Sequence, residues 1–209
     1  MRRPLLLGPP FITPLCIMSA PQTNPAEALL AGIGLSPDFM LQLGKESDWS
    51  LIIKLHAMFE AIVGSLIVRQ LNTPDIEEVV AHLDFNNARS GKVAFARALG
   101  LVGKREVAFL RGFSELRNTL VHDIRNVQFN LGEYVRKLDS AGLKKFKNEI
   151  GAPLCGITGG ERVYAQFLKQ DPRMIVFLAA YSCLLILQFN VSAKSRNALV
   201  EALLQRTKQ

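Results

Sequence analysis

Residues 104–123 read KREVAFLRGFSELRNTLVHD, and this stretch decides the fold. Its large apolar residues recur at spacings of four, three and four: Phe109, Phe113, Leu116 and Leu120. That spacing is the period of an amphipathic α-helix with one buried face, and it predicts a helix that begins near Lys104. Because no segment of useful length alternates apolar and polar residues, the sequence predicts an all-α protein.

Three polar residues near the end of this predicted helix form the candidate catalytic group: Arg117, Asn118 and His122. At about 100° per residue, His122 lies on the same face as Asn118, whereas Arg117 lies about 100° away, beside the apolar face. The polar face also carries three candidate substrate-binding residues: Arg111, Ser114 and Arg125. A permanent cation beside an apolar face needs a carboxylate, a phosphate or a partner subunit.

An arginine, an amide and a histidine are the groups that metal-free phosphodiester chemistry requires. Each residue also has an ordinary structural interpretation. His122 could be a surface histidine, Asn118 could form hydrogen bonds between helices, and Arg117 could pair with Glu60 or Asp123. Glu60 lies in the middle of a long predicted helix and is the candidate supporting partner of Arg117.

The combination resembles the signature of the HEPN superfamily, in which an arginine and a polar residue precede a histidine, with four to six residues between arginine and histidine. Upstream, residues 85–102 (FNNARSGKVAFARALGLV) resemble the helix and the Ala-Leu-Gly-Leu turn before this motif in the mannitol operon repressor branch. The likeness covers roughly residues 48 to 126. It implies a HEPN-type helical bundle, a fold that many metal-independent ribonucleases share.

The resemblance also implies roles for the motif residues. His122 would act as general base or acid, Arg117 would stabilise the negative charge at phosphorus, and Asn118 would orient His122 or the phosphate. The motif helices of two protomers face each other in such domains, so a homodimer is expected. The alternative is a non-catalytic transcriptional regulator or protein-interaction module, with a regulatory protein as partner. A toxin with a cognate antitoxin is a third interpretation.

The charge of the chain favours an acidic partner such as RNA. The formal net charge is +7 and the isoelectric point is about 9.5. Ten basic and five acidic residues lie between positions 104 and 147, an excess of +5 around the motif. RNA phosphates would meet the protein there.

Neither a metal site nor a cofactor is predicted. The three cysteines, Cys16, Cys155 and Cys183, are odd in number and far apart, which suits a reducing cytosol. His56 and His82 are too distant from them in sequence to form a recognisable metal motif.

The first 24 residues contain five prolines without helical periodicity and are predicted to be disordered or loosely packed. Arg2 and Arg3 precede a leucine run, as in a signal peptide, but the prolines interrupt that run. We therefore expect a cytoplasmic protein. Residues 174–187 carry no charge, but a bilayer core needs about 20 apolar residues. This stretch is predicted to be a helix buried in the bundle or at a dimer contact, and not a membrane span.

Residues 25–209 are predicted to form one helical domain, with a HEPN-like core at about 48–126 and C-terminal helices over 131–205. Ser47 or Asp48 is expected to cap a long helix that ends near Leu71. The glycine-rich residues 151–160 are interpreted as a connector. Further helices are predicted at 26–33, 38–43, from 73 onward, and at 87–99, 131–138, 141–150 and 195–209.

Overall fold

The computed structural model describes residues 24–73 and 75–206. Within these ranges the chain forms eleven α-helices and one 3-10 helix and contains no strand, which confirms the all-α prediction. The elements are α1 (Pro25–Gly32), α2 (Phe39–Leu43), α3 (Asp48–Leu71), α4 (Ile76–His82), α5 (Lys92–Ala98), α6 (Lys104–Val121), η1 (Ile124–Gln128), α7 (Leu131–Arg136), α8 (Ser140–Asn148), α9 (Ala152–Cys155), α10 (Gly160–Gln170) and α11 (Pro172–Arg206). The predicted N-terminal segment lies outside the described residues, except for Asn24, which caps α1.

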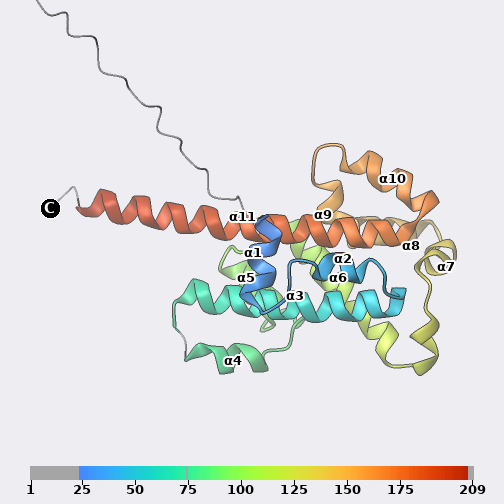
Figure 1. Cartoon of the computed structure of the whole chain (residues 1–209), viewed down its shortest axis with the longest axis horizontal. Coiled ribbons are helices and arrows are strands. Elements are labelled where there is room, and N and C mark those ends of the chain that lie inside the picture. The colour runs from blue at the N-terminus through green and yellow to red at the C-terminus, as the bar shows by residue number, and fades with distance from the viewer. Residues whose placement is uncertain (1–23, 74, 207–209) are drawn as a thin grey trace, which may run out of the picture.

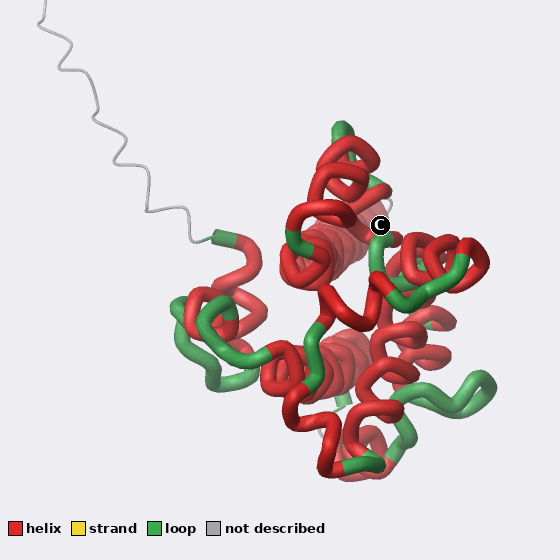
Figure 2. Tube along the Cα trace, turned by 90° about the vertical axis from the view of Figure 1, so that its right-hand side faces the viewer, coloured by secondary structure: helices red, strands yellow, loops and turns green. Residues whose placement is uncertain are grey.

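The long helices frame the molecule. In Figure 1, α11 runs along one side, α3 lies roughly parallel to it with α1 crossing between them, and α4 covers the far side of α3. Helices α7 to α10 gather near the beginning of α11, whose C-terminal part extends past the rest of the bundle (Figure 1). Figure 2 shows the same helices from the end at which α11 begins, and they are joined by short loops.

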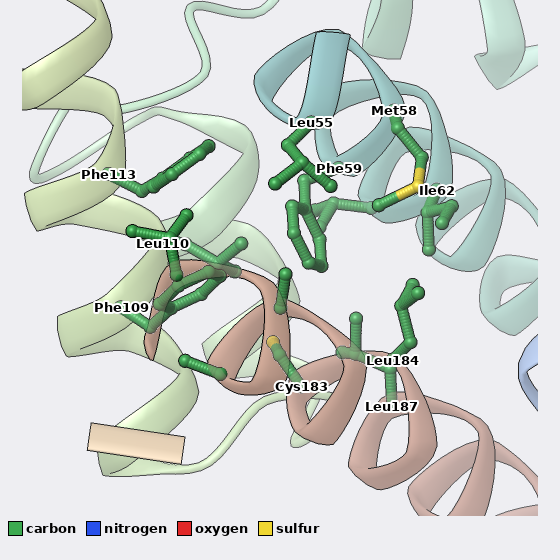
Figure 3. Packing of buried hydrophobic residues seen from close by; sticks show 14 of the residues in the cluster. Leu55, Met58, Phe59, Ile62, Phe109, Leu110, Phe113, Cys183, Leu184 and Leu187 are labelled. Atoms are coloured by element: carbon green, nitrogen blue, oxygen red, sulfur yellow. The ribbon is translucent and has the colours of Figure 1, made fainter. Parts of the chain in front are cut away.

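The core forms where α3, α6 and α11 meet. Figure 3 shows Phe59 of α3 facing Phe109 of α6, with Cys183 and Leu184 of α11 beside them. The rings of Phe59 and Phe109 meet edge to face with their centroids 5.4 Å apart. All four side chains are fully buried, and they belong to one apolar cluster that extends from Ala26 to Leu187. The helix that carries the motif is thus fixed against the two longest helices of the bundle.

Helix α3 has the predicted bounds because its ends are encoded locally. The Ser47 hydroxyl accepts the N–H of Ser50, so it satisfies one of the free donors of the first turn. At the other end Asn72 adopts a left-handed conformation with a φ of 50°, which stops the helix.

The turn before α6 is held by α11. Gly100 has a φ of +65°, a conformation that glycine adopts without strain. Asn190 donates a hydrogen bond to the Leu101 carbonyl at 3.1 Å, and the Lys194 ammonium donates to the carbonyl of Leu99. The Ala-Leu-Gly-Leu turn therefore fixes the direction in which the motif helix leaves α5.

Helix α11 packs one face into the core, and every residue of the predicted stretch 174–187 is buried or partly buried. Ile175, Ala179 and Cys183 are fully buried, whereas Phe189 is 65% exposed. Two helices, Asp48–Leu71 and Pro172–Lys194, are long and apolar enough to cross a bilayer. The core helix of a soluble bundle has the same length and composition, and 56% of the apolar stretch in α3 is buried inside the structure.

Two expectations from the sequence need correction. Helix α5 begins at Lys92, not at Asn87, because side chains of the preceding loop bind its backbone: Asp84 Oδ1 accepts the N–H groups of Asn86 and Asn87 at 2.7 Å. The predicted connector at 151–160 contains α9, whose Pro153 and Leu154 are buried. A short helix with a proline in its first turn and a glycine at its end has the same residue types as a loop, so the sequence pattern did not distinguish the two.

Candidate functional site: a polar cleft beside the motif helix

A cleft of about 470 Å³ lies between α3, the loop before α5 and the C-terminal half of α6. Three elements supply its lining: His56 and Glu60 from α3, residues 83–87 from the loop, and Ser114, Arg117 and Asn118 from α6. The cleft thus brings together three of the residues predicted from the motif helix and the predicted supporting residue Glu60.

Arg117 lines this cleft and binds no carboxylate of the described residues. Its Nη1 donates a hydrogen bond to Asn118 Oδ1 at 3.0 Å, and its Nε is buried with no hydrogen-bond partner in the described part of the chain. Neither alternative partner of Arg117, Glu60 or Asp123, forms an ion pair with it in this part of the chain. Glu60 Oε1 instead accepts Lys92 Nζ at 2.9 Å, and Asp123 pairs with Arg125 at 2.6 Å.

The helical wheel placed Arg117 on a different face from Asn118, but both residues line the same cleft. An arginine side chain is long enough to reach round the helix, and the hydrogen bond to Asn118 holds its guanidinium on that side. The two side chains therefore offer a cation and an amide at one place.

His56 also lines the cleft, although it was not among the predicted site residues. It is 5% exposed, and its Nε2 lies 3.3 Å from the hydroxyl oxygen of Ser114, which is 3% exposed. Burial, with a smaller contribution from the charge of Arg117, lowers the pKa of His56 below its usual value, while Glu60 opposes this shift. His56 is therefore neutral at neutral pH. One signal could have found it: His56 and Glu60 interrupt the apolar run of α3 at positions i and i+4.

His122 does not line the cleft of its own chain. It is the exposed residue that follows the last turn of α6. Three apolar side chains close to it in sequence are also exposed, by 38% for Val121, 83% for Ile124 and 43% for Val127. Within one protomer His122 therefore lies outside the lining of the cleft, one helical turn after Asn118 and beside exposed apolar residues.

Of the three predicted substrate-binding residues, Ser114 alone lines the cleft. Arg111 Nη2 donates to the Ala88 carbonyl at 3.4 Å, so Arg111 contacts the loop that forms one wall. The Arg125 side chain is 88% exposed and binds both carboxylate oxygens of Asp123. This hydrogen bonding lowers the pKa of Asp123. Arg125 is thus paired outside the cleft.

The described residues contain no group of three or more His, Cys, Asp or Glu side chains that could hold a metal ion. No known protein family, curated protein or solved structure matches the chain. The side chains of the cleft offer a guanidinium, amides, a hydroxyl, a neutral imidazole and two carboxylates.

We expect the loss of Glu60 and the loss of Lys92 to change the free energy of unfolding by different amounts. The Lys92 side chain is 7% exposed and that of Glu60 is 38% exposed. Glu60→Ala leaves a buried ammonium alone and should lower the free energy of unfolding by about 2–4 kcal/mol. Lys92→Met leaves Glu60 in contact with water and should change it by less than about 1 kcal/mol. Urea denaturation measures both values, and equal losses would contradict this account of the pair.

Proposed function

We propose that the protein is a metal-independent RNA endonuclease of the HEPN type, which cuts by attack of an RNA 2′-hydroxyl on the adjacent phosphate. The observation that carries this proposal is Arg117, a cation at a cleft with no carboxylate bound to it in the described residues. A phosphate oxygen is the ligand that best matches a guanidinium. The excess of basic residues around the motif would favour approach of an RNA backbone.

In the proposed reaction the 2′-oxygen forms a bond to phosphorus while the bond from phosphorus to the 5′-oxygen breaks. His122 removes the proton of the 2′-hydroxyl or supplies a proton to the leaving 5′-oxygen, since an imidazole can act as either base or acid. Arg117 stabilises the additional negative charge on the phosphoryl oxygens. Asn118 positions the Arg117 guanidinium against the phosphate through its hydrogen bond. The products are a 2′,3′-cyclic phosphate and a free 5′-hydroxyl.

The test of this proposal is the metal dependence of cleavage and the chemistry of its product. Cleavage of total cellular RNA should persist in excess EDTA, because the proposed proton transfer and charge stabilisation use side chains alone. The 3′ ends should carry 2′,3′-cyclic phosphate, which mass spectrometry of a short RNA identifies. Activity lost in EDTA and restored by magnesium would contradict the mechanism.

We further propose that the active form is a symmetric homodimer in which His122 of one protomer completes the cleft of its partner. The support is the position of His122 outside its own cleft and the exposed apolar residues beside it: Val121, Ile124 and Val127. A two-fold contact would bury this patch on both chains. We also propose that the protein acts in the reducing cytoplasm, which its three widely spaced cysteines favour.

Light scattering should return a dimer at micromolar concentration, and Ile124→Asp should convert it to a monomer with much lower cleavage activity. The reason is that a charge at an 83% exposed position is tolerated by a free surface but not by an apolar contact. Leu41→Asp, at a 68% exposed position on α2, is the matched control and should leave the dimer intact. A wild-type monomer at all concentrations would refute the composite cleft.

The second candidate function is a non-catalytic regulator or protein-interaction module, similar to the mannitol operon repressor branch. One observation favours it: His122 is absent from the lining of the cleft that contains Arg117 and Asn118. Such a protein would bind nucleic acid or a partner without cutting. Genes beside the coding sequence discriminate further, since a sugar-transport operon favours a regulator and a nucleotidyltransferase-like neighbour favours a toxin with its antitoxin.

A further inference from the structure

The proposed cleavage explains Arg117 and Asn118 but not the acidic side chains that share their cleft. Asp84 and Glu60 both line it. Each carboxylate uses one oxygen internally: Asp84 Oδ1 accepts two backbone N–H groups at 2.7 Å, and Glu60 Oε1 accepts Lys92 Nζ. Their second oxygens accept no hydrogen bond from the described residues. Two carboxylates would repel a phosphate, so the part of the ligand that contacts Asp84 and Glu60 is not its phosphate.

Asn86 adds a third acceptor to the same wall. Its Oδ1 is buried and has no hydrogen-bond partner among the described residues, which is an unfavourable state for an amide oxygen. Asn86 lines the cleft beside Asp84. The loop from Asp84 to Asn87 is held by its own hydrogen bonds, so the acceptors are fixed before any ligand arrives.

Apolar side chains lie beside these acceptors. Leu83 and Phe85 line the cleft, and the Phe85 ring meets the ring of His56 at 71° with centroids 5.0 Å apart. A nucleobase has the matching chemistry, because its flat faces are apolar and its edge carries hydrogen-bonding groups. The volume of about 470 Å³ is large enough for one nucleotide.

We propose that the cleft binds one unpaired guanine nucleotide of the RNA, with the base edge at Asp84 and the phosphate at Arg117. This inference rests on the proposed RNA cleavage. Guanine alone among the four bases offers two adjacent donors on its Watson–Crick edge, N1–H and the N2 amine, and the two lone pairs of the free Asp84 Oδ2 can accept both. Uracil offers one N–H between two carbonyl oxygens, and adenine and cytosine offer an amine beside a ring acceptor.

The test measures binding of fluorescein-labelled, 2′-O-methyl RNA hexamers, which cannot be cut, by fluorescence anisotropy. Each hexamer contains five uridines and one guanosine, inosine or 7-deazaguanosine. Inosine lacks the N2 amine, whereas 7-deazaguanosine keeps the Watson–Crick edge. The guanosine hexamer should bind about tenfold more tightly than the inosine hexamer, and 7-deazaguanosine should match guanosine.

Three variants identify the residues that act. Asp84→Asn keeps an oxygen for the loop N–H groups but replaces the free acceptor with a donor, so it should abolish the preference for guanosine over inosine. Asp38→Asn makes the same chemical change at the exposed residue before α2 and should preserve the preference. Arg117→Ala should weaken all three hexamers equally.

The outcomes separate the two proposals. If guanosine and inosine bind alike while Arg117→Ala still weakens both, the guanine assignment is wrong and RNA binding at Arg117 stands. A preference that survives Asp84→Asn also refutes the assignment. If the wild type binds no hexamer and cuts no RNA, the proposed function and the guanine assignment fail together.

Discussion

Replacement of His122 by alanine should lower the rate of RNA cleavage by about 10²–10⁴-fold, the range that a general acid or base contributes. RNA affinity should stay the same, because the proposed phosphate contacts belong to Arg117 and Asn118. The melting temperature should also stay the same, since His122 is exposed at the end of α6. Single-turnover cleavage and fluorescence anisotropy measure the rate and the affinity separately.

His82→Ala is the matched control, because His82 is also an exposed histidine at the end of a helix and lies far from the motif in sequence. It should cut RNA at the wild-type rate. Wild-type cleavage by His122→Ala would remove the proposed chemistry and leave the non-catalytic regulator as the better account.

A mixing experiment tests whether His122 acts on the cleft of its partner. Arg117→Ala and His122→Ala chains are each inactive alone, but in a mixed dimer one composite cleft retains both residues. Random mixing should restore about one quarter of the wild-type activity, because half of the dimers are mixed and one of their two clefts is intact. If both residues act within one protomer, the mixture stays inactive.

The parts of the fold that sequence predicted are those with local signals. The bounds of α3 follow from Ser47 at its beginning and from Asn72 and Thr73 at its end, and the start of α6 follows from Gly103 and the period of its apolar residues. Helix α5 was predicted too long because Asp84 and Asn87 bind the loop backbone and delay the helix. Burial of α11 depends on which neighbours cover it, and periodicity does not contain that information.

The residues of the candidate site also differ in whether a local sequence signal identifies them. Ser114, Arg117 and Asn118 belong to one helix, so a sequence motif could identify them. His56 and the loop at 83–87 join them only through the packing of α3 and α5 against α6, across 58 residues in the case of His56 and Ser114. Glu60 was identified, but its partner is Lys92, which lies 32 residues away and has no spacing relation to it.

Phe59→Ala should lower the free energy of unfolding by about 3–5 kcal/mol, the range for a large aromatic side chain removed from a core. Phe59 is fully buried at the meeting point of α3, α6 and α11, and its contact with the Phe109 ring would be lost (Figure 3). Phe59→Leu fills most of the space and should cost less than about 1.5 kcal/mol. Urea denaturation followed by circular dichroism measures both values.

Phe189→Ala provides the control, because Phe189 is 65% exposed on α11, and it should change the free energy of unfolding by less than about 0.5 kcal/mol in a monomer. If Phe59→Ala and Phe189→Ala lower the free energy of unfolding equally, α3 and α6 are not packed through Phe59.

The contact of Phe59 with α6 also holds together the two helices that carry His56 and Ser114 in the cleft. We therefore expect Phe59→Ala to weaken RNA binding even where the chain is still folded, whereas Phe59→Leu preserves it.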